Sequence, residues 1–161
     1  MMIRIGYGYD VHPFEKNKKL IIGGIQTKHP NGLGLSGHSD ADVLTHAIID
    51  ALIGAFGYGS IGEFFPETDT FKDSDSIELL KNIMKILNER EEFKINNIDA
   101  TVLSSSVRIF PLKEQIKQKL STTMNMDSKY INIKGKSGNT LGIAGKDKGI
   151  EAHCVLLVKV K

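Results

Sequence analysis

The segment from about Asp40 to Phe56 constrains the fold most strongly, because its apolar residues recur at the spacing of an α-helix. The apolar stripe consists of Val43, Leu44, Ala47, Ile48, Ala51, Leu52 and Ala55. Ser39 suits the N-cap of this helix, and Asp42 then falls at its third position, in an acidic variant of the capping box. The stripe has to be buried against another layer of secondary structure, so the chain must fold as at least two layers.

The rest of the sequence mixes strand and helix patterns without strict alternation. The expected strands are 3–9, 19–27, 98–106, 130–136 and 150–160, the second of them a hairpin that turns through Gly23 and Gly24. The further expected helices are 76–90 and 112–124, and the expected loops are 29–37, 57–75 and 135–149. The fold class is therefore α+β, an α/β sandwich, in which one domain of residues 1–161 has a small mixed β-sheet covered by helices on one face. The uncovered face of such a sheet indicates an oligomer.

Composition excludes several classes of protein. The net charge of +2 gives no reason to expect nucleic acid or an anionic membrane as a partner. No apolar run approaches the ~20 residues that span a bilayer. The one cysteine, Cys154, lies in an apolar run and excludes an intramolecular disulfide, so we expect it in the core of a protein from a reducing compartment. The expected location is the cytoplasm, and a plastid-type organelle stays open if a transit segment was removed.

Five polar residues form the pattern of a metal site. Asp10 and His12 are two apart on an expected strand and so share a face. His38, Asp42 and His46 are four apart and so are expected to share one face of the helix. Two histidines and a carboxylate with an open position are typical of catalytic zinc. The spacing does not choose which three of the five bind, and a buried hydrogen-bond network is the alternative.

The remaining histidines and a glycine-rich loop give weaker signals. His29 lies in a turn-rich loop, where we expect it to be solvated, and His153 is expected to be structural or interfacial. The loop "GKSGNTLGIAGKDKG" lets backbone N–H groups approach an anion, and Lys136, Ser137 and Lys146 can donate hydrogen bonds to phosphate. It does not match the P-loop pattern, and a solvated glycine hairpin is the alternative. Metal and phosphate donors together indicate phosphoryl chemistry.

Four segments carry a resemblance to a known family: "RIGYGYDVHPF", "IIGGI", "GLSGHSDADVLTHAIIDALIGAFGYGSIGEFFPETD" and "INIKGKSGNTLGIAGKDKGIEAH". Together they resemble 2-C-methyl-D-erythritol 2,4-cyclodiphosphate synthase over nearly the whole chain. The resemblance implies a phosphorus-oxygen lyase of the non-mevalonate isoprenoid pathway. Its substrate is 4-diphosphocytidyl-2-C-methyl-D-erythritol 2-phosphate, whose 2-phosphate attacks the β-phosphorus and expels CMP. Such an enzyme folds its substrate and neutralises phosphate charge.

The resemblance also implies residue roles. Asp10, His12 and His46 would bind one Zn²⁺ per subunit, and His38 and Ser137 would be catalytic, stabilising the transition state. The implied substrate-binding residues are Asp10, His12, His38, Ser39, Ser60, Ile61, Gly62, Phe65, Pro66, Glu67, Thr68, Asp69, Ser104, Ser105, Ser106, Arg108, Phe110, Lys136, Ser137, Asn139, Ile143 and Lys146. Of these, the stretch 104–110 would line the cytosine and CMP pocket. The family is a homotrimer whose active sites lie between adjacent subunits.

The chain departs from the family pattern at several positions. Ser60 and Glu67 each stand where the family has Asp, and Lys146 and His153 stand where it has Arg and Glu. Asn139 replaces a Glu that helps to hold a second metal, Mg²⁺ or Mn²⁺, between the phosphates. Two alternatives to the synthase therefore stay open. One is a zinc-dependent phosphohydrolase of a nucleotide-like diphosphate, and the other is a non-catalytic trimer of the same fold.

Overall fold

The computed structural model describes residues 1–66, 68, 70 and 72–161. Its strands and α-helices, in chain order, are β1 (Met2–Lys16), β2 (Leu20–Ile22), β3 (Ile25–Thr27), β4 (Leu33–Leu35), α1 (Val43–Phe56), α2 (Ile61–Phe64), α3 (Ser76–Arg90), β5 (Phe93–Leu103), α4 (Lys113–Met124), β6 (Ile131–Lys136), α5 (Gly142–Gly145) and β7 (Gly149–Val160). Short 3₁₀ turns are η2 (Phe110–Leu112), η3 (Ser128–Tyr130) and η4 (Gly138–Thr140).

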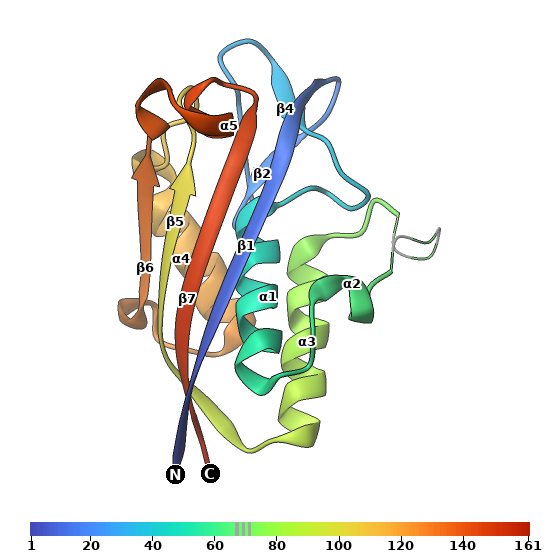
Figure 1. Ribbon diagram of the computed structural model, residues 1–161, viewed down its shortest axis with the longest axis vertical. Helices are drawn as coiled ribbons and strands as arrows, with labels where there is room; N and C mark the ends of the chain where they lie inside the picture. Colours follow the sequence, from blue (N-terminus) through green and yellow to red (C-terminus); the bar gives the residue numbers. More distant parts are fainter. Residues whose placement is uncertain (67, 69, 71) are drawn as a thin grey trace.

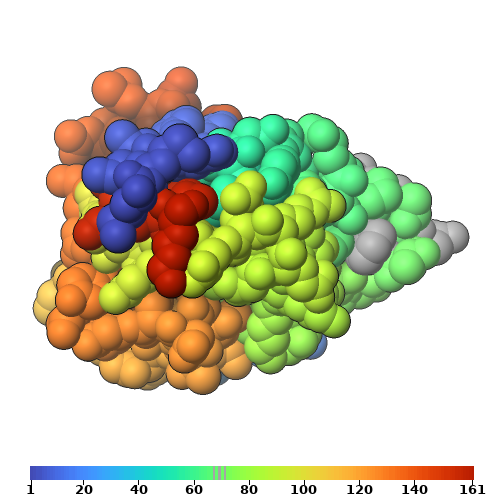
Figure 2. All heavy atoms as spheres, turned by 90° about the horizontal axis from the view of Figure 1, so that it is seen from below, coloured from blue at the N-terminus to red at the C-terminus, as the bar shows by residue number. Residues whose placement is uncertain are grey.

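A five-stranded sheet in the order β4-β1-β7-β5-β6 forms one layer of the molecule (Figure 1). The sheet is mixed, because β5 and β6 are parallel while the other neighbours are antiparallel. The β1–β7 ladder runs from the pair Met2 and Val160 to the pair Pro13 and Gly149. It therefore brings the two ends of the chain side by side at one end of the molecule (Figure 2). The expected hairpin of β2 and β3 is confirmed.

Helices α1 and α4 lie on one face of this sheet, as expected, and α3 packs against both helices (Figure 1). The central helix α1 lies directly on β1 and β7, and its apolar stripe is buried there. Two glycines of β1 allow this contact: a Cβ at Gly6 would lie 1.8 Å from the Ala51 carbonyl oxygen, and one at Gly8 would lie 1.9 Å from that of Ala47. The sheet and helix backbones thus touch where the metal-site pattern begins.

The helix of the first apolar stripe begins later than predicted, at Val43, and its N-cap is Asp42 rather than Ser39. Ala41, just before the cap, has a φ of 56°, in the left-handed region that a helix cannot continue through. The Asp42 side chain is fully buried and accepts hydrogen bonds from the amides of Gly23 and Gly24, at 2.8 and 2.6 Å. It therefore ties the β2–β3 turn to the start of α1.

Other boundaries also differ from the sequence predictions. The first strand continues past residue 9 to Lys16, because its ladder with β7 extends through the Asp10 and His12 positions. The expected loop 29–37 contains the short strand β4, and the expected loop 57–75 contains the four-residue helix α2. The expected helix 76–90 matches α3 at both ends.

The second face of the sheet carries exposed apolar side chains. Ile3, Ile5, Tyr7, Tyr9 and Val155 are between 39% and 69% exposed. We call these five residues the bare face. Within the part of the chain that the structure describes, no helix is long and apolar enough to cross a membrane.

Candidate functional site

Asp10, His12 and His46 form a compact cluster where β1 meets α1. The Asp10 Oδ2 atom lies 3.0 Å from both His12 Nε2 and His46 Nδ1, and the two ring nitrogens are 3.2 Å apart. One ligand atom from each residue falls within 4.8 Å of the others. Among the described residues this is the one group of three or more histidine, cysteine or acidic side chains close enough to hold a metal ion.

Local structure explains why these three side chains meet. Asp10 and His12 lie two apart on β1 and point to the helix-covered face. His46 lies in the first turn of α1, directly above. A Cβ at Gly37 would lie 2.7 Å from His12 Cε1, so the loop passes the imidazole only because residue 37 has no side chain.

Hydrogen bonds fix the tautomer of each neutral ring. His12 Nδ1 lies 2.7 Å from the Ser36 carbonyl oxygen, which can only accept, so the proton is on Nδ1 and Nε2 is bare. His46 Nε2 lies 2.8 Å from Ser76 Oγ. Because Ser76 donates its own proton to Asp40, its oxygen accepts from His46 Nε2–H, which leaves Nδ1 bare.

The cluster therefore points three electron-pair donors at one another. The Asp10 oxygen and the two bare ring nitrogens lie about a hydrogen-bond length apart with no proton between them in these tautomers. Two imidazoles and a carboxylate are a donor set that suits Zn²⁺. The residues present thus fit a divalent cation that would neutralise this repulsion.

The electrostatics of the cluster agree with that role. Burial opposes ionisation of Asp10, but the His12 and His46 rings outweigh it, because in their protonated form they attract the carboxylate and donate hydrogen bonds to it; the pKa of the carboxyl is therefore held below its usual value. Burial also disfavours charge on His12, yet the Asp10 carboxylate raises the pKa of the imidazole. The site therefore keeps an anion and attracts positive charge.

The predicted polar face of His38, Asp42 and His46 does not exist. His38 precedes α1, and its Nε2–H donates to the Thr68 carbonyl oxygen at 2.7 Å. Asp42 is the cap and points to the β2–β3 turn. The four-residue spacing fails because the helix starts after both residues.

Two residues of the site carried no signal in the sequence. Ser76, fully buried at the start of α3, and Asp40, which accepts from the Ser76 amide at 3.0 Å and from its hydroxyl, together orient His46. Ser39 Oγ shares the same ring atom, Nε2, at 3.0 Å. Such partners fix ring orientation and raise ligand basicity in metal sites. Ser76 is 30 residues from His46 in the chain, so only the tertiary fold reveals the contact.

A cavity of about 170 Å³ opens over the cluster. Its lining is Asp10, His12, His38, Ser39, His46, Ile61, Gly62, Phe65 and Leu79. The structure therefore gathers eight of the sequence-predicted residues around the metal cluster and adds Leu79. We call this the metal cavity.

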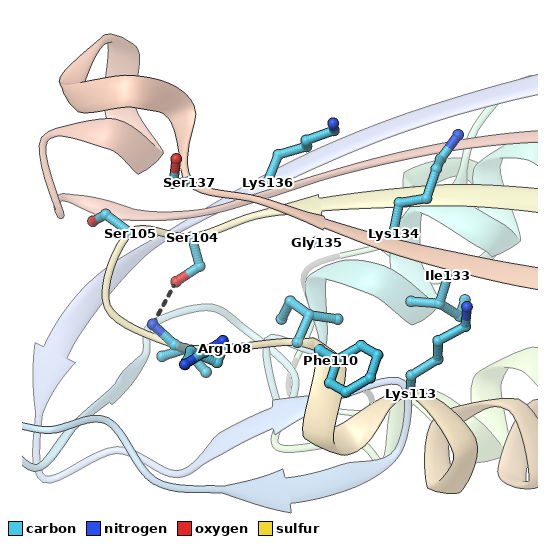
Figure 3. Close-up of a pocket in the computed structure, with 12 residues that line it drawn as sticks. Ser104, Ser105, Arg108, Phe110, Lys113, Ile133, Lys134, Gly135, Lys136 and Ser137 are labelled. Carbon is cyan, nitrogen blue, oxygen red and sulfur yellow. Dashed lines mark hydrogen bonds between the residues drawn. The ribbon is translucent and has the colours of Figure 1, made fainter.

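A second cavity, of about 610 Å³, lies between β6 and the segment that follows β5 (Figure 3). Its lining is Ser104, Ser105, Val107, Arg108, Ile109, Phe110, Lys113, Ile133, Lys134, Gly135, Lys136 and Ser137. Four of these side chains are cationic and none is acidic, which suits an anionic ligand. Lys134 is paired with Asp99 at 2.6 Å. We call this the cationic cavity; it shares no described residue with the metal cavity.

Several predicted residues line neither cavity: Ser60, Pro66, Thr68, Ser106, Asn139, Ile143 and Lys146. Glu67 and Asp69 lie outside the described residues. Asn139 follows Ser137 in a turn and has a φ of 49°, a left-handed conformation that asparagine tolerates better than most residues. Its backbone N–H donates to Ser137 Oγ at 3.3 Å.

The prediction that His29 is solvated is wrong. It is 4% exposed, because its ring packs edge-on against Phe14 and beneath the segment after β5. The prediction that Cys154 is buried is confirmed.

Comparison with known proteins identifies the family of the chain. The family model described as "YgbB family" matches residues 3–159. The 2-C-methyl-D-erythritol 2,4-cyclodiphosphate synthase of Petrotoga mobilis is 50% identical over 159 residues, covering 99% of this chain and 98% of its own. The synthase of the same name from Thermotoga maritima is 48% identical over 157 residues, covering 98% of this chain and 92% of its own.

Solved structures give the same result. A structure titled IspF from Plasmodium falciparum, in complex with CDP, has a TM-score of 0.84 at 31% identity, covering 99% of this chain and 97% of that one. The bifunctional IspDF of Campylobacter jejuni has a TM-score of 0.92 at 37% identity; it covers 99% of this chain, which spans 43% of that longer protein. The chain therefore belongs to the YgbB family, together with the 2-C-methyl-D-erythritol 2,4-cyclodiphosphate synthases.

Proposed function

We propose that this chain converts 4-diphosphocytidyl-2-C-methyl-D-erythritol 2-phosphate to 2-C-methyl-D-erythritol 2,4-cyclodiphosphate and CMP, in the non-mevalonate route to isoprenoids. An oxygen of the 2-phosphate forms a bond to the β-phosphorus, and the bond from that phosphorus to the CMP oxygen breaks. The observation that carries the proposal is the metal cluster of Asp10, His12 and His46, in a chain about half identical to enzymes of that name.

The metal part of the proposal assigns one Zn²⁺ to Asp10, His12 and His46. When bound, this ion would polarise a phosphoryl oxygen and offset the charge that builds up on the diphosphate. We further propose Mg²⁺ or Mn²⁺ with the diphosphate, near Asn139, whose neutral amide offers a weaker ligand than a carboxylate.

The chain's own residues would bring the two phosphates together. His38 and Ser39 line the metal cavity beside the cluster and can donate to phosphate or erythritol oxygens. Lys136 and Ser137 line the cationic cavity and can hold the diphosphate and stabilise its developing charge. Ser60, Ile61 and Gly62, with 65–69, are proposed to contact the ribose and erythritol.

The cationic cavity is the proposed nucleotide site. Arg108, Lys113 and Lys136 supply positive charge for the CMP phosphate, and the apolar walls of Ile109 and Phe110 suit a pyrimidine base. The Plasmodium falciparum relative is described as a CDP complex, which supports a cytidine nucleotide as ligand of the family.

The proposed assembly is a homotrimer with an active site between each pair of subunits. The bare face supplies an apolar surface of the kind that becomes buried on association. An interfacial site would let the metal cavity of one subunit face the cationic cavity of the next; within one chain the two cavities share no described residue. The proposal treats 1–161 as a single domain, and a cytoplasmic location is supported by the free thiol of Cys154, which suits a reducing compartment.

Phosphorus NMR of the purified protein with this substrate, Zn²⁺ and Mg²⁺ tests the proposal. We expect cyclic diphosphate and CMP in equal amounts. Linear phosphates would instead establish a phosphohydrolase, and zinc binding without any turnover would favour a non-catalytic trimer. A matched sample with Ser137→Ala should form product at least ~10-fold more slowly with its zinc content unchanged, because one donor to developing charge is removed.

A further inference from the structure

His29 lies in a buried contact that the proposed chemistry does not use. Its side chain is completely buried, and its ring packs edge-on against Phe14 with ring centroids 4.5 Å apart. The residue comes from the segment between β3 and β4, yet it reaches the segment that follows β5, 77 residues later in the chain. Burying an imidazole costs free energy unless it is hydrogen-bonded, so its polar partners on several segments indicate a role beyond filling space.

The hydrogen bonds of His29 determine its tautomer. The backbone N–H of Asn31 donates to His29 Nδ1 at 3.0 Å, so Nδ1 carries no proton and Nε2 must carry it in the neutral ring. Nε2–H therefore donates to Ser106 Oγ, 2.8 Å away. The carboxylate of Asp147 lies 3.7 Å from the same nitrogen. This direction excludes His29 as a base that activates the Ser106 hydroxyl, because Nε2 has no free electron pair.

Ser106 connects His29 to the segment that lines the cationic cavity, although Ser106 itself does not line it. It belongs to the segment 104–110, which we call the wall loop because most of its members line that cavity. Its neighbours Ser105 and Val107 face the cavity, whereas Ser106 is turned inward to His29. Ser104, Ser105, Arg108 and Phe110 of the wall loop line this cavity (Figure 3).

Other contacts also hold the wall loop. Val107 and Ile109 are buried in the core, and the Ile109 carbonyl accepts from the Leu112 amide at 2.9 Å. The Ser104 amide donates to the Lys136 carbonyl at 2.8 Å, and the Ser104 hydroxyl accepts from the Val107 amide within the loop. Ser105 Oγ donates to Asp147 at 3.1 Å, but that pair is exposed. The contact between the buried His29 and the half-buried Ser106 thus adds a side-chain hydrogen bond between this loop and the segment between β3 and β4.

We propose that His29 is a positioning residue for nucleotide binding, which holds the wall loop in the conformation that forms the cationic cavity. The inference rests on the proposed function, because it takes that cavity as the site of the cytidine nucleotide. Without the hydrogen bond to His29 the wall loop would be more mobile, and nucleotide binding would have to order it. The entropy lost in this ordering would weaken the affinity for nucleotide. The metal cavity, built from other residues, would be unaffected.

Two variants of the full-length protein test this role. His29→Phe keeps an aromatic ring against Phe14 but removes both hydrogen bonds, and Ser106→Ala removes only the acceptor. Ser121→Ala is the matched control, because Ser121 also donates a side-chain hydrogen bond, to the Met126 carbonyl, far from both cavities. The readouts are the Kd for CMP by calorimetry, amide hydrogen exchange over the wall loop, and KM and kcat measured separately.

We expect a Kd for CMP about tenfold higher in both variants, as for one lost hydrogen bond, with faster exchange in the wall loop. KM should rise by a similar factor while kcat and zinc content stay near wild type. Unchanged CMP affinity and loop exchange in Ser106→Ala, whose fold is least disturbed, would overturn the inference. If the wild-type protein bound no CMP, the assignment of the cavity and the nucleotide part of this inference would both fall. Exchange in the wall loop would still decide whether His29 holds it.

Discussion

The two faces of the five-stranded sheet differ although they are made by the same strands. Toward the helices, β1 presents Gly6, Gly8, Asp10 and His12, and these residues meet α1 at close contact. Away from the helices, the alternate residues of the same strand, from Ile3 onward, form the bare face. One face therefore completes a metal cluster within a single chain, while the other exposes apolar area that a single chain leaves uncovered.

The metal cluster and the cationic cavity also differ in how they are built. The metal cluster is held by partners from its own chain, chiefly Ser36, Ser76 and Asp40. The cationic cavity lies elsewhere in the same subunit and shares no described residue with the metal cavity. The proposed homotrimer would place the metal cavity of one subunit beside the cationic cavity of the next, with the bare face buried between subunits.

Removing a ligand from the helix-covered face should have the largest effect. His46→Ala leaves Asp10 and His12 as two ligands, too few for a catalytic zinc site, so we expect zinc to be lost and turnover to be abolished. Zinc per subunit, measured by atomic emission after dialysis, checks this. The control is His153→Ala, which removes a histidine from the opposite side of β7 and should leave zinc unchanged. Retained zinc with a near-normal rate in His46→Ala would refute the ligand assignment.

The next largest effect should come from filling the gap between sheet and helix. A Cβ at Gly8 would lie 1.9 Å from the Ala47 carbonyl oxygen, so Gly8→Ala forces α1 away from β1. We expect a loss of ~3 kcal/mol in the free energy of unfolding, measured by urea denaturation.

Gly54→Ala is the matched control, because the same substitution in α1 meets its nearest atom, the Tyr7 carbonyl oxygen, at 3.8 Å. Alanine is a better helix former than glycine, so this variant should gain about 0.5–1 kcal/mol. Equal free energies of unfolding in the two variants would show that the close contact between β1 and α1 does not make Gly8 necessary for stability.

Sequence patterns predicted the elements better than they predicted the site. The bounds of α3 and the β2–β3 turn follow from local periodicity and glycine placement, which a single segment contains. The start of α1 was missed because the left-handed turn at Ala41, held by Asp42 bonds to a distant hairpin, depends on tertiary contact. Spacing also left five ligand candidates open, and the resemblance, rather than the spacing, chose the three that the fold brings together.

Charge on the bare face should break the proposed assembly while leaving each subunit folded. Val155→Asp places a carboxylate on a residue that is 46% exposed in one chain and would be buried between subunits. We expect light scattering to show the trimer mass for the wild type and a smaller species for this variant, with zinc still bound. Tyr130→Asp, at a position 44% exposed and away from the bare face, is the control and should remain trimeric. A wild-type monomer would contradict the proposal that this face recruits neighbours.

The last prediction compares the thiol reactivity of two adjacent positions on opposite faces of the sheet, 154 and 155. We expect no change in activity. Burial, with a smaller contribution from Asp99, raises the pKa of the Cys154 thiol to about 12. At pH 8 a thiol with that pKa has roughly a thousandth of the thiolate of an ordinary cysteine, so we expect iodoacetamide to leave the native protein unlabelled and to label it in urea. The thiol introduced by Val155→Cys, in a Cys154→Ala background, distinguishes the faces further: it should react readily in a monomer and slowly in a trimer. Rapid labelling of native Cys154 would mean that the covered face opens, because a buried thiol of this pKa can react only when the helices move away from the sheet.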